Sequence, residues 1–256
     1  MGARDTARGA DAVASIVAEN ASCADKIEVV QCDVTDAASV SGAAATVKAS
    51  LGSVPLYGLV NNAGAGLAHG VSAKQIVETN LYGAKRVGDA FVPLLSPTEG
   101  RVVNVGSGIG PGWMSRAAPE VKSTLVSPQV TWEQVDSIAQ ADLASGGQGE
   151  NAGRGPEFNA YGMTKATLMA YTHVLVATHP NITSSTCSPG FIDTAMTKGF
   201  NAKLTPEQGT VSIRHCLFSQ LGGNGWMWGS DAKRSPIDAS REPGDPEYTD
   251  PSGRGY

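Results

Sequence analysis

The chain alternates short apolar runs with longer segments whose apolar residues recur at helical spacing. The runs over residues 27–32, 56–60, 101–105, 182–188 and 225–229 have the length and content of buried strands. The segments between them carry apolar residues three and four positions apart, which predicts helices. This alternation indicates an α/β fold with a doubly wound parallel sheet of the Rossmann type, in which ligands bind at the carboxyl ends of the strands.

Capping residues and prolines set the expected helix boundaries. The expected helices cover 6–22, with Thr6 as its cap, a segment that begins at Thr35 or Asp36 and ends at about 51, and 72–95. Further helices are expected from the capping box of Thr131 and Gln134, over 159–179, and from Thr205-Pro206. Residues 109–157 form an excursion with Gly and Pro at both ends. The last predicted strand is followed by a polar tail over 231–256, expected on the surface or partly disordered.

Composition limits the classes of function. With 256 residues, 41% of them apolar, the chain can form one large domain, expected over 1–230. The 19 basic and 24 acidic residues give a net charge of -5 without a basic run, so nucleic acid is not an expected partner. The 4 cysteines and 4 histidines lack metal-ligand spacing, and no metal site is predicted.

The sequence shows neither an apolar run of membrane-spanning length nor a recognisable signal peptide. A cytoplasmic protein without a membrane partner is therefore expected. The opening residues MGARDT also match the letter of an N-myristoylation pattern. We favour another reading of these residues, as part of a cofactor site.

Polar residues and glycines follow directly after the predicted strands. Asp33, the segment 61–64, Ser107 and the pair Pro189-Gly190 each stand at a carboxyl strand end. A parallel sheet brings such ends to one edge. We therefore expect these residues to line a common crevice.

Tyr161 and Lys165 are the strongest candidates for chemistry. Four residues apart on a helix, they project from the same face. An ammonium about 4 Å from a phenol favours the phenolate by up to about 4 kcal/mol, which lowers the tyrosine pKa by roughly three units. Such a pair can exchange a proton with a substrate oxygen. The spacing alone also fits a surface helix with an extended lysine.

Four motifs in order, VNNAG at 60–64, NVGSG at 104–108, YGMTK at 161–165 and SPGFIDT at 188–194, resemble the short-chain dehydrogenase/reductase family over residues 2 to about 230. In that family a nicotinamide cofactor exchanges hydride with a carbonyl or an alcohol. The resemblance implies that Tyr161 is the general acid/base and that Lys165 holds the nicotinamide ribose and lowers the tyrosine pKa. It further implies that Ser107 binds the substrate oxygen and that Asn80 supports a proton-relay water through its helix.

The resemblance also assigns residues to the cofactor. Arg4 and Arg8 would bind the 2′-phosphate of NADPH, because a guanidinium matches a phosphate, whereas an acidic residue would match a bare ribose hydroxyl. Asp5 stands one place late for the second role, and Arg8 also fits an exposed helix face. The other implied contacts, beside Tyr161 and Lys165, are Asp33, Val34, Asn61, Gly64, Pro189, Gly190, Ile192 and Thr194.

The separation of Ser107 and Tyr161 is much larger than in ordinary members of the family, and the excess is the insertion at 109–157. This insertion resembles the monomeric carbonyl reductases, in which it covers a helix face that other members use for pairing. We therefore expect a monomer that reduces small-molecule ketones, aldehydes or quinones with NADPH.

Members of the family begin with a strand, a glycine-rich TGxxxGxG turn and a helix, and this sequence shows no match to them before Gly2. The turn holds the cofactor diphosphate and the strand is central in the sheet. We therefore expect an N-terminally truncated domain that lacks the first βα unit and most of the second strand. Two functions stay open: a carbonyl reductase represented by an incomplete chain, and a non-catalytic binding or regulatory protein, or truncated gene product, that no longer binds nucleotide.

Overall fold

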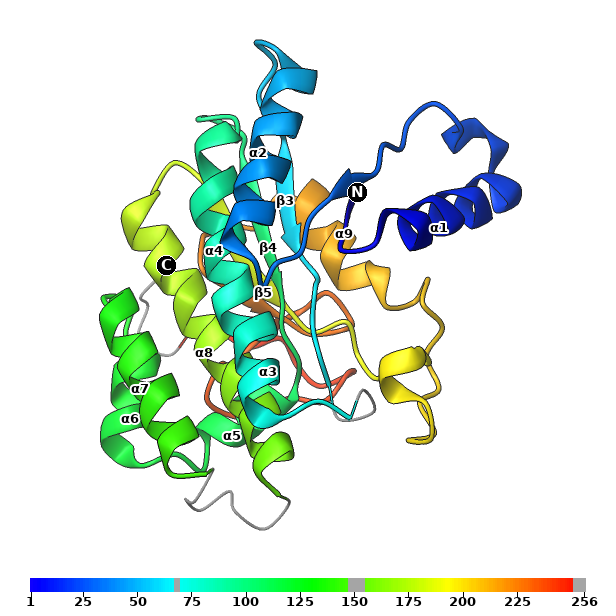
Figure 1. Ribbon diagram of the computed structural model, residues 1–256. Coiled ribbons are helices and arrows are strands. Elements are labelled where there is room, and N and C mark those ends of the chain that lie inside the picture. The colour runs from blue at the N-terminus through cyan, green and yellow to red at the C-terminus, as the bar shows by residue number, and fades with distance from the viewer. Residues whose placement is uncertain (67–69, 147–154, 251–256) are drawn as a thin grey trace.

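The computed structural model describes residues 1–66, 70–146 and 155–250 (Figure 1). Its main sheet has the order β3-β4-β5-β6-β7, with β3 at Gly58–Asn61, β4 at Arg101–Val105, β5 at Thr183–Cys187, β6 at Met227–Trp228 and β7 at Arg234–Ser235. Strands β3 to β6 run parallel, and β7 pairs antiparallel with β6. The predicted Rossmann-type α/β fold with a parallel sheet is confirmed.

A second, two-stranded sheet joins β1 (Gly2–Ala3) and β2 (Val30–Gln31) in parallel. The strand expected over 27–32 is shorter than predicted because its partner β1 offers two residues for pairing. Within the described ranges no strand joins the two sheets, and β3 forms one edge of the main sheet.

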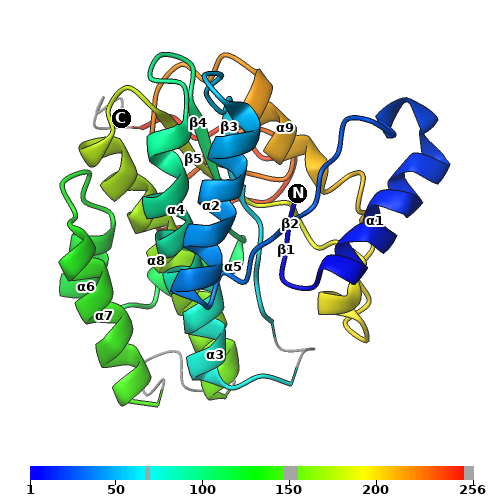
Figure 2. The same ribbon diagram turned by 45° about the horizontal axis from the view of Figure 1, so that its top comes forward.

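Helices cover both faces of the main sheet (Figures 1 and 2). On one face α4 (Gly83–Phe91) contacts β3, and α8 (Pro156–Thr178) contacts β4 and β5, while α2 (Ala37–Leu51) packs beside α4. On the other face α9 (Thr210–Phe218) contacts β4 and β5. Successive residues of β4 serve the two layers: Val102 belongs to the core under α8, and Val103 to the core under α9.

The helix expected over 72–95 is divided into four parts. These are α3 (Ala73–Val77), a π-helical turn at Glu78–Tyr82, α4, and a 3-10 turn at Val92–Leu94. The capping box of Ser72 and Gln75 begins the series. The π-helical turn contains Asn80, which places a candidate site residue at the irregular point of the helix.

The insertion folds as a layer of helices on α8. Its elements are α5 (Ile109–Met114), α6 (Pro119–Leu125) and α7 (Trp132–Ala144), and each of them contacts α8. The predicted capping box of Thr131 and Gln134 begins α7. Residues 147–154 of the insertion lie outside the described residues. Nearly every residue of α8 from Asn159 to Leu175 is buried, because this layer covers the helix from one side and the sheet from the other.

The first helix, α1 (Thr6–Glu19), lies at the side of the molecule with β1 and β2, followed by a 3-10 turn at Ala21–Cys23 (Figure 2). Its cap is Asp5, whose carboxylate accepts hydrogen bonds from the backbone of Ala7 and Arg8, and not Thr6 as predicted. The helix expected from Thr205 begins at Thr210. Thr205 and Gln208 instead close a turn through their side chains.

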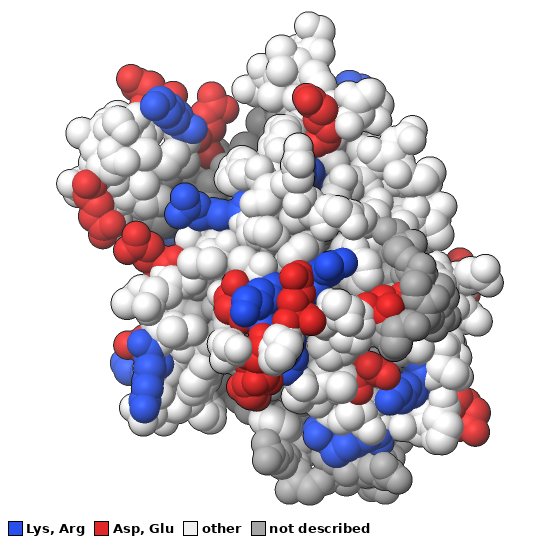
Figure 3. Space-filling model, turned by 180° about the vertical axis from the view of Figure 1, so that it is seen from behind, with Lys and Arg blue, Asp and Glu red and all other residues white. Residues whose placement is uncertain are grey.

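The polar segment after β6 is part of the fold up to residue 250, because β7 extends the main sheet. Residues 251–256 lie outside the described residues. On the face shown in Figure 3, acidic and basic side chains are interspersed. No helix in the described part of the chain is both long and apolar enough to cross a membrane.

Candidate active site

The structure brings Tyr161, Lys165 and Ser107 together. Tyr161 and Lys165 lie one turn apart on α8, and Ser107 follows directly after β4. The hydroxyl of Ser107 lies close enough to the Tyr161 phenol to lower its pKa. The ammonium nitrogen of Lys165 lies 5.6 Å from the centre of the Tyr161 ring and donates a 2.8 Å hydrogen bond to the carbonyl oxygen of Val105. The end of β4 therefore contacts both functional side chains of the helix.

Two glycines allow α5 to approach α8 closely. A Cβ on Gly110 would lie 2.9 Å from the backbone carbonyl carbon of Lys165, and a Cβ on Gly162 would lie 3.2 Å from the ring of Trp113. A side chain at Gly110 would therefore push the two helices apart. Because α5 begins two residues after Ser107, this close contact also sets the position of Ser107 against Tyr161.

The electrostatic balance at this pair differs from the expectation. Burial raises the pKa of Tyr161, and the nearby Ser107 hydroxyl only partly opposes that effect. The expected lowering of the tyrosine pKa by Lys165 is not found, because the lysine is itself buried, with 7% of its surface exposed. Burial lowers the pKa of Lys165 to about 8. At neutral pH the pair is a neutral phenol beside an ammonium that loses its proton at mildly alkaline pH.

Asn80 connects the loop after β3 with α8. Its side-chain oxygen accepts a 2.7 Å hydrogen bond from the backbone of Ala65, and its amide group donates to the carbonyl of Ala65 at 3.0 Å and to Thr164 at 3.3 Å. The side chain is buried and satisfied by these partners. Asn80 thus holds the 61–66 loop against the helix that carries Tyr161.

Asn61 takes part in a buried hydrogen-bond chain that crosses the sheet. It donates to Asn104 at 2.8 Å, Asn104 donates to Thr172 at 2.8 Å, and Thr172 shares a 2.6 Å bond with Thr186. The chain links β3, β4, α8 and β5. Sequence reasoning missed Asn104, Thr172 and Thr186, since the only available signal was a polar side chain within a predicted strand or helix.

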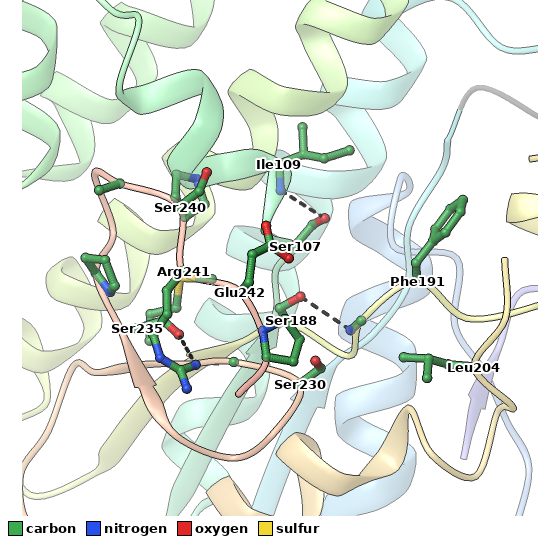
Figure 4. A pocket seen from close by; sticks show the side chains of 18 residues that line it. Ser107, Ile109, Ser188, Phe191, Leu204, Ser230, Ser235, Ser240, Arg241 and Glu242 are labelled. Carbon is green, nitrogen blue, oxygen red and sulfur yellow. Dashed lines mark hydrogen bonds between the residues drawn. The ribbon is translucent and has the colours of Figure 1, made fainter. Parts of the chain in front are cut away.

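Ser107 also lines a pocket of about 550 Å³ at the carboxyl ends of the strands (Figure 4). Apolar side chains from three regions form much of its wall: Ile109, Pro111, Phe191, Leu204, Met227, Pro236, Ala239 and Pro243. Hydroxyls of Ser188, Ser230, Ser235 and Ser240 are interspersed among them. The tail after β6, expected to be peripheral, supplies the wall from Ser235 to Pro243. Tyr161 does not line this pocket but lies next to Ser107, which does.

Arg4 and Arg8 lie away from this pocket and line a separate cavity of about 370 Å³, together with Met1, Ala3, Asp5, Gly9 and Ala12. The carboxylate of Asp5 is engaged in capping α1. The cavity therefore combines two guanidinium groups with Asp5, whose carboxylate already has backbone partners. At Asp33, burial alone would raise the pKa, but hydrogen bonds from Thr35 and the charges of Arg4 and Arg86 lower it overall.

The other expected cofactor residues are dispersed. Gly190, with a φ of 86°, lines the pocket, whereas Pro189 does not. The side chain of Ile192 packs on Gly209, and the exposed Thr194 forms a capping box with Thr197. Val34 packs on Gly83.

Gly64 lies beside Met196, which also covers Gly66 next to the ring of Tyr161. A Cβ on Gly66 would lie 2.9 Å from Met196 and 3.8 Å from Tyr161. Met196 is therefore a neighbour of the active-site tyrosine that no sequence motif indicated.

Among the described residues, no group of His, Cys, Asp and Glu has the arrangement of a metal site.

Comparisons with known proteins give consistent results for the family and the fold. The family profile described as short chain dehydrogenase matches residues 2–118. The chain is 31% identical over 254 residues to short-chain dehydrogenase/reductase 1 of Saponaria officinalis, in an alignment that covers 86% of this chain and 81% of the relative. It is 28% identical over 219 residues to human carbonyl reductase (NADPH) 1, covering 81% and 76%. The solved structure of salutaridine reductase from Papaver somniferum superposes with a TM-score of 0.72 at 25% identity, covering 88% of this chain and 89% of that one.

Proposed function

The chain belongs to the short-chain dehydrogenase family, and from that premise we propose that it reduces carbonyl compounds to alcohols with NADPH, using Tyr161 as the proton donor. The observation that carries the proposal is the convergence of Tyr161, Lys165 and Ser107, with Ser107 on the wall of a pocket. The similarity to carbonyl reductase (NADPH) 1 supports the choice of reaction and of cofactor.

The residues present fit the two ends of NADPH. Arg4 and Arg8 would hold the 2′-phosphate, since two guanidinium groups border one cavity and Asp5 is engaged as a helix cap. At the other end, Lys165, beside Tyr161, would hold the ribose next to the nicotinamide. When bound, the cofactor supplies the hydride.

The protein side chains then control the charge on the substrate oxygen. Negative charge develops on that oxygen as the carbonyl carbon is reduced, and two hydroxyl donors stabilise it. Ser107 donates a hydrogen bond, and Tyr161 transfers its proton to the oxygen. The charged Lys165 stabilises the phenolate left behind and is held in reach by the carbonyl of Val105. Ser107 can return a hydrogen bond to the same phenolate.

The pocket supports a substrate of moderate size. Its volume of about 550 Å³ and its apolar wall suit an aromatic or alicyclic carbonyl compound. The serine hydroxyls provide the few polar contacts that orient such a molecule. We therefore propose aromatic aldehydes, ketones and quinones as the substrate class.

We also propose that the protein acts as a monomer. The helices α5, α6 and α7 cover α8, so that this helix has little apolar surface left for pairing. Analytical ultracentrifugation at micromolar concentration tests the proposal. A single species of one chain mass supports it, and a stable dimer contradicts it.

A second candidate function is a binding protein that does not catalyse. It is favoured by the separation of the β1-β2 sheet from the main sheet and by the position of Met196 over Gly66 beside Tyr161. Both features would work against a cofactor that has to extend from Arg4 to Tyr161.

Calorimetric titration with NADPH and NADH distinguishes the two candidates. The reductase predicts saturable binding of NADPH, weakened at least tenfold in Arg4→Ala and with little change in Glu19→Ala, an acidic residue of α1 that is absent from the cavity. Preference for NADH would overturn the assignment of the arginines. No binding of either nucleotide would favour the non-catalytic protein.

A further inference from the structure

Glu242 places a carboxylate on the wall of the pocket that Ser107 also lines. It belongs to the tail after β6, and in Figure 4 its side chain extends in the direction of Ser107. The residue is exposed, so a ligand in the pocket can reach its carboxylate. Apart from Glu242 and the neighbouring Arg241, the residues that line the pocket are uncharged.

Arg241 does not neutralise Glu242, because its guanidinium is engaged elsewhere. It contacts the carboxylate of Asp231 at 2.6 and 3.0 Å and donates to the carbonyl oxygens of Asp245 and Pro246 at 2.8 and 2.9 Å. Only 5% of the Arg241 side chain is exposed. The pair formed with Asp231 is therefore internal to the tail and leaves the charge of Glu242 uncompensated.

The backbone of Glu242 is fixed while its carboxylate stays free. Its backbone N–H donates to the side chain of Asp245 at 3.0 Å, and its carbonyl accepts from the backbone of Asp245 at 3.1 Å. In the described part of the chain, the Glu242 carboxylate makes no hydrogen bond or ion pair. A rigid turn thus presents one unpaired negative charge to the pocket, and little ordering is needed when a ligand pairs with it.

An unpaired carboxylate on this wall has a cost for a neutral substrate. The charge that develops on the substrate oxygen at Ser107 is negative, and Glu242 repels it. A cation carried by the substrate would pair with Glu242 and cancel the repulsion. The repulsion of the developing negative charge and the pairing with a cation both favour substrates that carry a positive charge.

We propose that Glu242 determines specificity by selecting carbonyl substrates that carry a cationic group, a protonated or quaternary amine. The inference rests on the proposed function and names the substrate class of that site. It assigns to the tail a part in recognition.

The test compares two aldehydes of equal shape. 4-(Trimethylammonio)benzaldehyde is a permanent cation, and 4-tert-butylbenzaldehyde is its neutral counterpart. The ratio of their kcat/KM values is measured for the wild type, for Glu242→Gln and for Asp238→Asn. Asp238 is the matched control, because it lies in the same tail and pairs with Lys122 but does not line the pocket.

We expect Glu242→Gln to lower the ratio of the kcat/KM values for the cationic and the neutral aldehyde by about two- to fivefold, the range for an ion pair that is partly screened by solvent. Asp238→Asn should leave the ratio unchanged. An unchanged ratio in Glu242→Gln, or an equal fall in both variants, overturns the inference even when both aldehydes are reduced.

A measurement without turnover separates this inference from the proposed function. Binding of 4-(trimethylammonio)benzyl alcohol and 4-tert-butylbenzyl alcohol is followed by ligand-observed NMR with the same variants. If neither aldehyde is reduced, the proposed function fails, and the inference is decided by whether Glu242→Gln weakens the cationic alcohol selectively. Equal affinity of wild type and variant for the cation overturns it.

Discussion

The ammonium nitrogen of Lys165 lies 5.6 Å from the centre of the Tyr161 ring. The distance places a cation beside the phenol without a direct hydrogen bond to it, since Lys165 donates instead to Val105. The charge state of Lys165 therefore decides whether a phenolate at Tyr161 is stabilised.

The first prediction concerns pH. Burial lowers the pKa of Lys165 from 10.5 to about 8, so the unfolded chain binds more protons than the folded chain between these values. The contribution of Lys165 to stability therefore rises with pH across this window, by up to about 3 kcal/mol. Urea unfolding at several pH values should show this rise relative to Lys165→Met. Identical pH profiles of the two proteins would contradict the buried ammonium.

The same pKa predicts the pH dependence of turnover. Reductase activity should decline as pH increases through about 8, because Lys165 loses the charge that stabilises the tyrosine phenolate. The measurement is kcat against pH with an aromatic aldehyde. A rate that stays constant to pH 10 would remove Lys165 from the mechanism.

A second pair of residues tests how Ser107 is positioned. In Gly110→Ala the new methyl group would lie 2.9 Å from the backbone of Lys165, whereas in Gly112→Ala, on the same helix, the nearest atom would be at 3.8 Å. We expect Gly110→Ala to cost about 1 to 3 kcal/mol of stability through overpacking and to lower kcat. Gly112→Ala should change neither markedly. Similar kinetics in the two variants would show that the α5–α8 contact does not position Ser107.

The tail supplies a further prediction. Asp231 has a pKa lowered to about 2, mainly by its hydrogen bonds with Arg241. Its contribution to stability is present above pH 4 and is lost as pH falls towards 2, because the unfolded chain takes up the proton first. Asp231→Asn should cost about 1 to 3 kcal/mol and leave Arg241 unpaired. Proteolysis of the tail reports the change, and a tail as resistant as in the wild type would contradict this role of the pair.

Parts of this structure were predictable from sequence because local signals were strong. The run at 101–105 forms β4 as predicted, and the helix that carries Tyr161 ends within a residue of its expected end at 179. The π-helical turn at Asn80 was not predictable from the local sequence. Within that turn the Asn80 side chain is hydrogen-bonded to Ala65, which lies outside the helix, and local residue patterns do not encode such a contact. The pocket wall formed by the tail was missed for the same reason, because the Asp231–Arg241 pair that holds it is specified only by the folded chain.

The candidate site shows the same division. Motifs identified Tyr161, Lys165 and Ser107, which the fold brings together. The direction of the pKa shift at Tyr161 was missed, because it depends on how deeply the phenol and the ammonium are buried. Residue type and spacing carry no measure of burial.

The most direct test is NADPH oxidation in the presence of an aromatic aldehyde, compared between wild type, Tyr161→Phe and Tyr171→Phe. Tyr171 is the matched control, because it lies on the same helix and its buried hydroxyl has no hydrogen-bond partner among the described residues. If Tyr161 is the proton donor, Tyr161→Phe loses about a hundredfold to ten-thousandfold in kcat while Tyr171→Phe retains activity. Wild-type turnover in Tyr161→Phe would contradict the account.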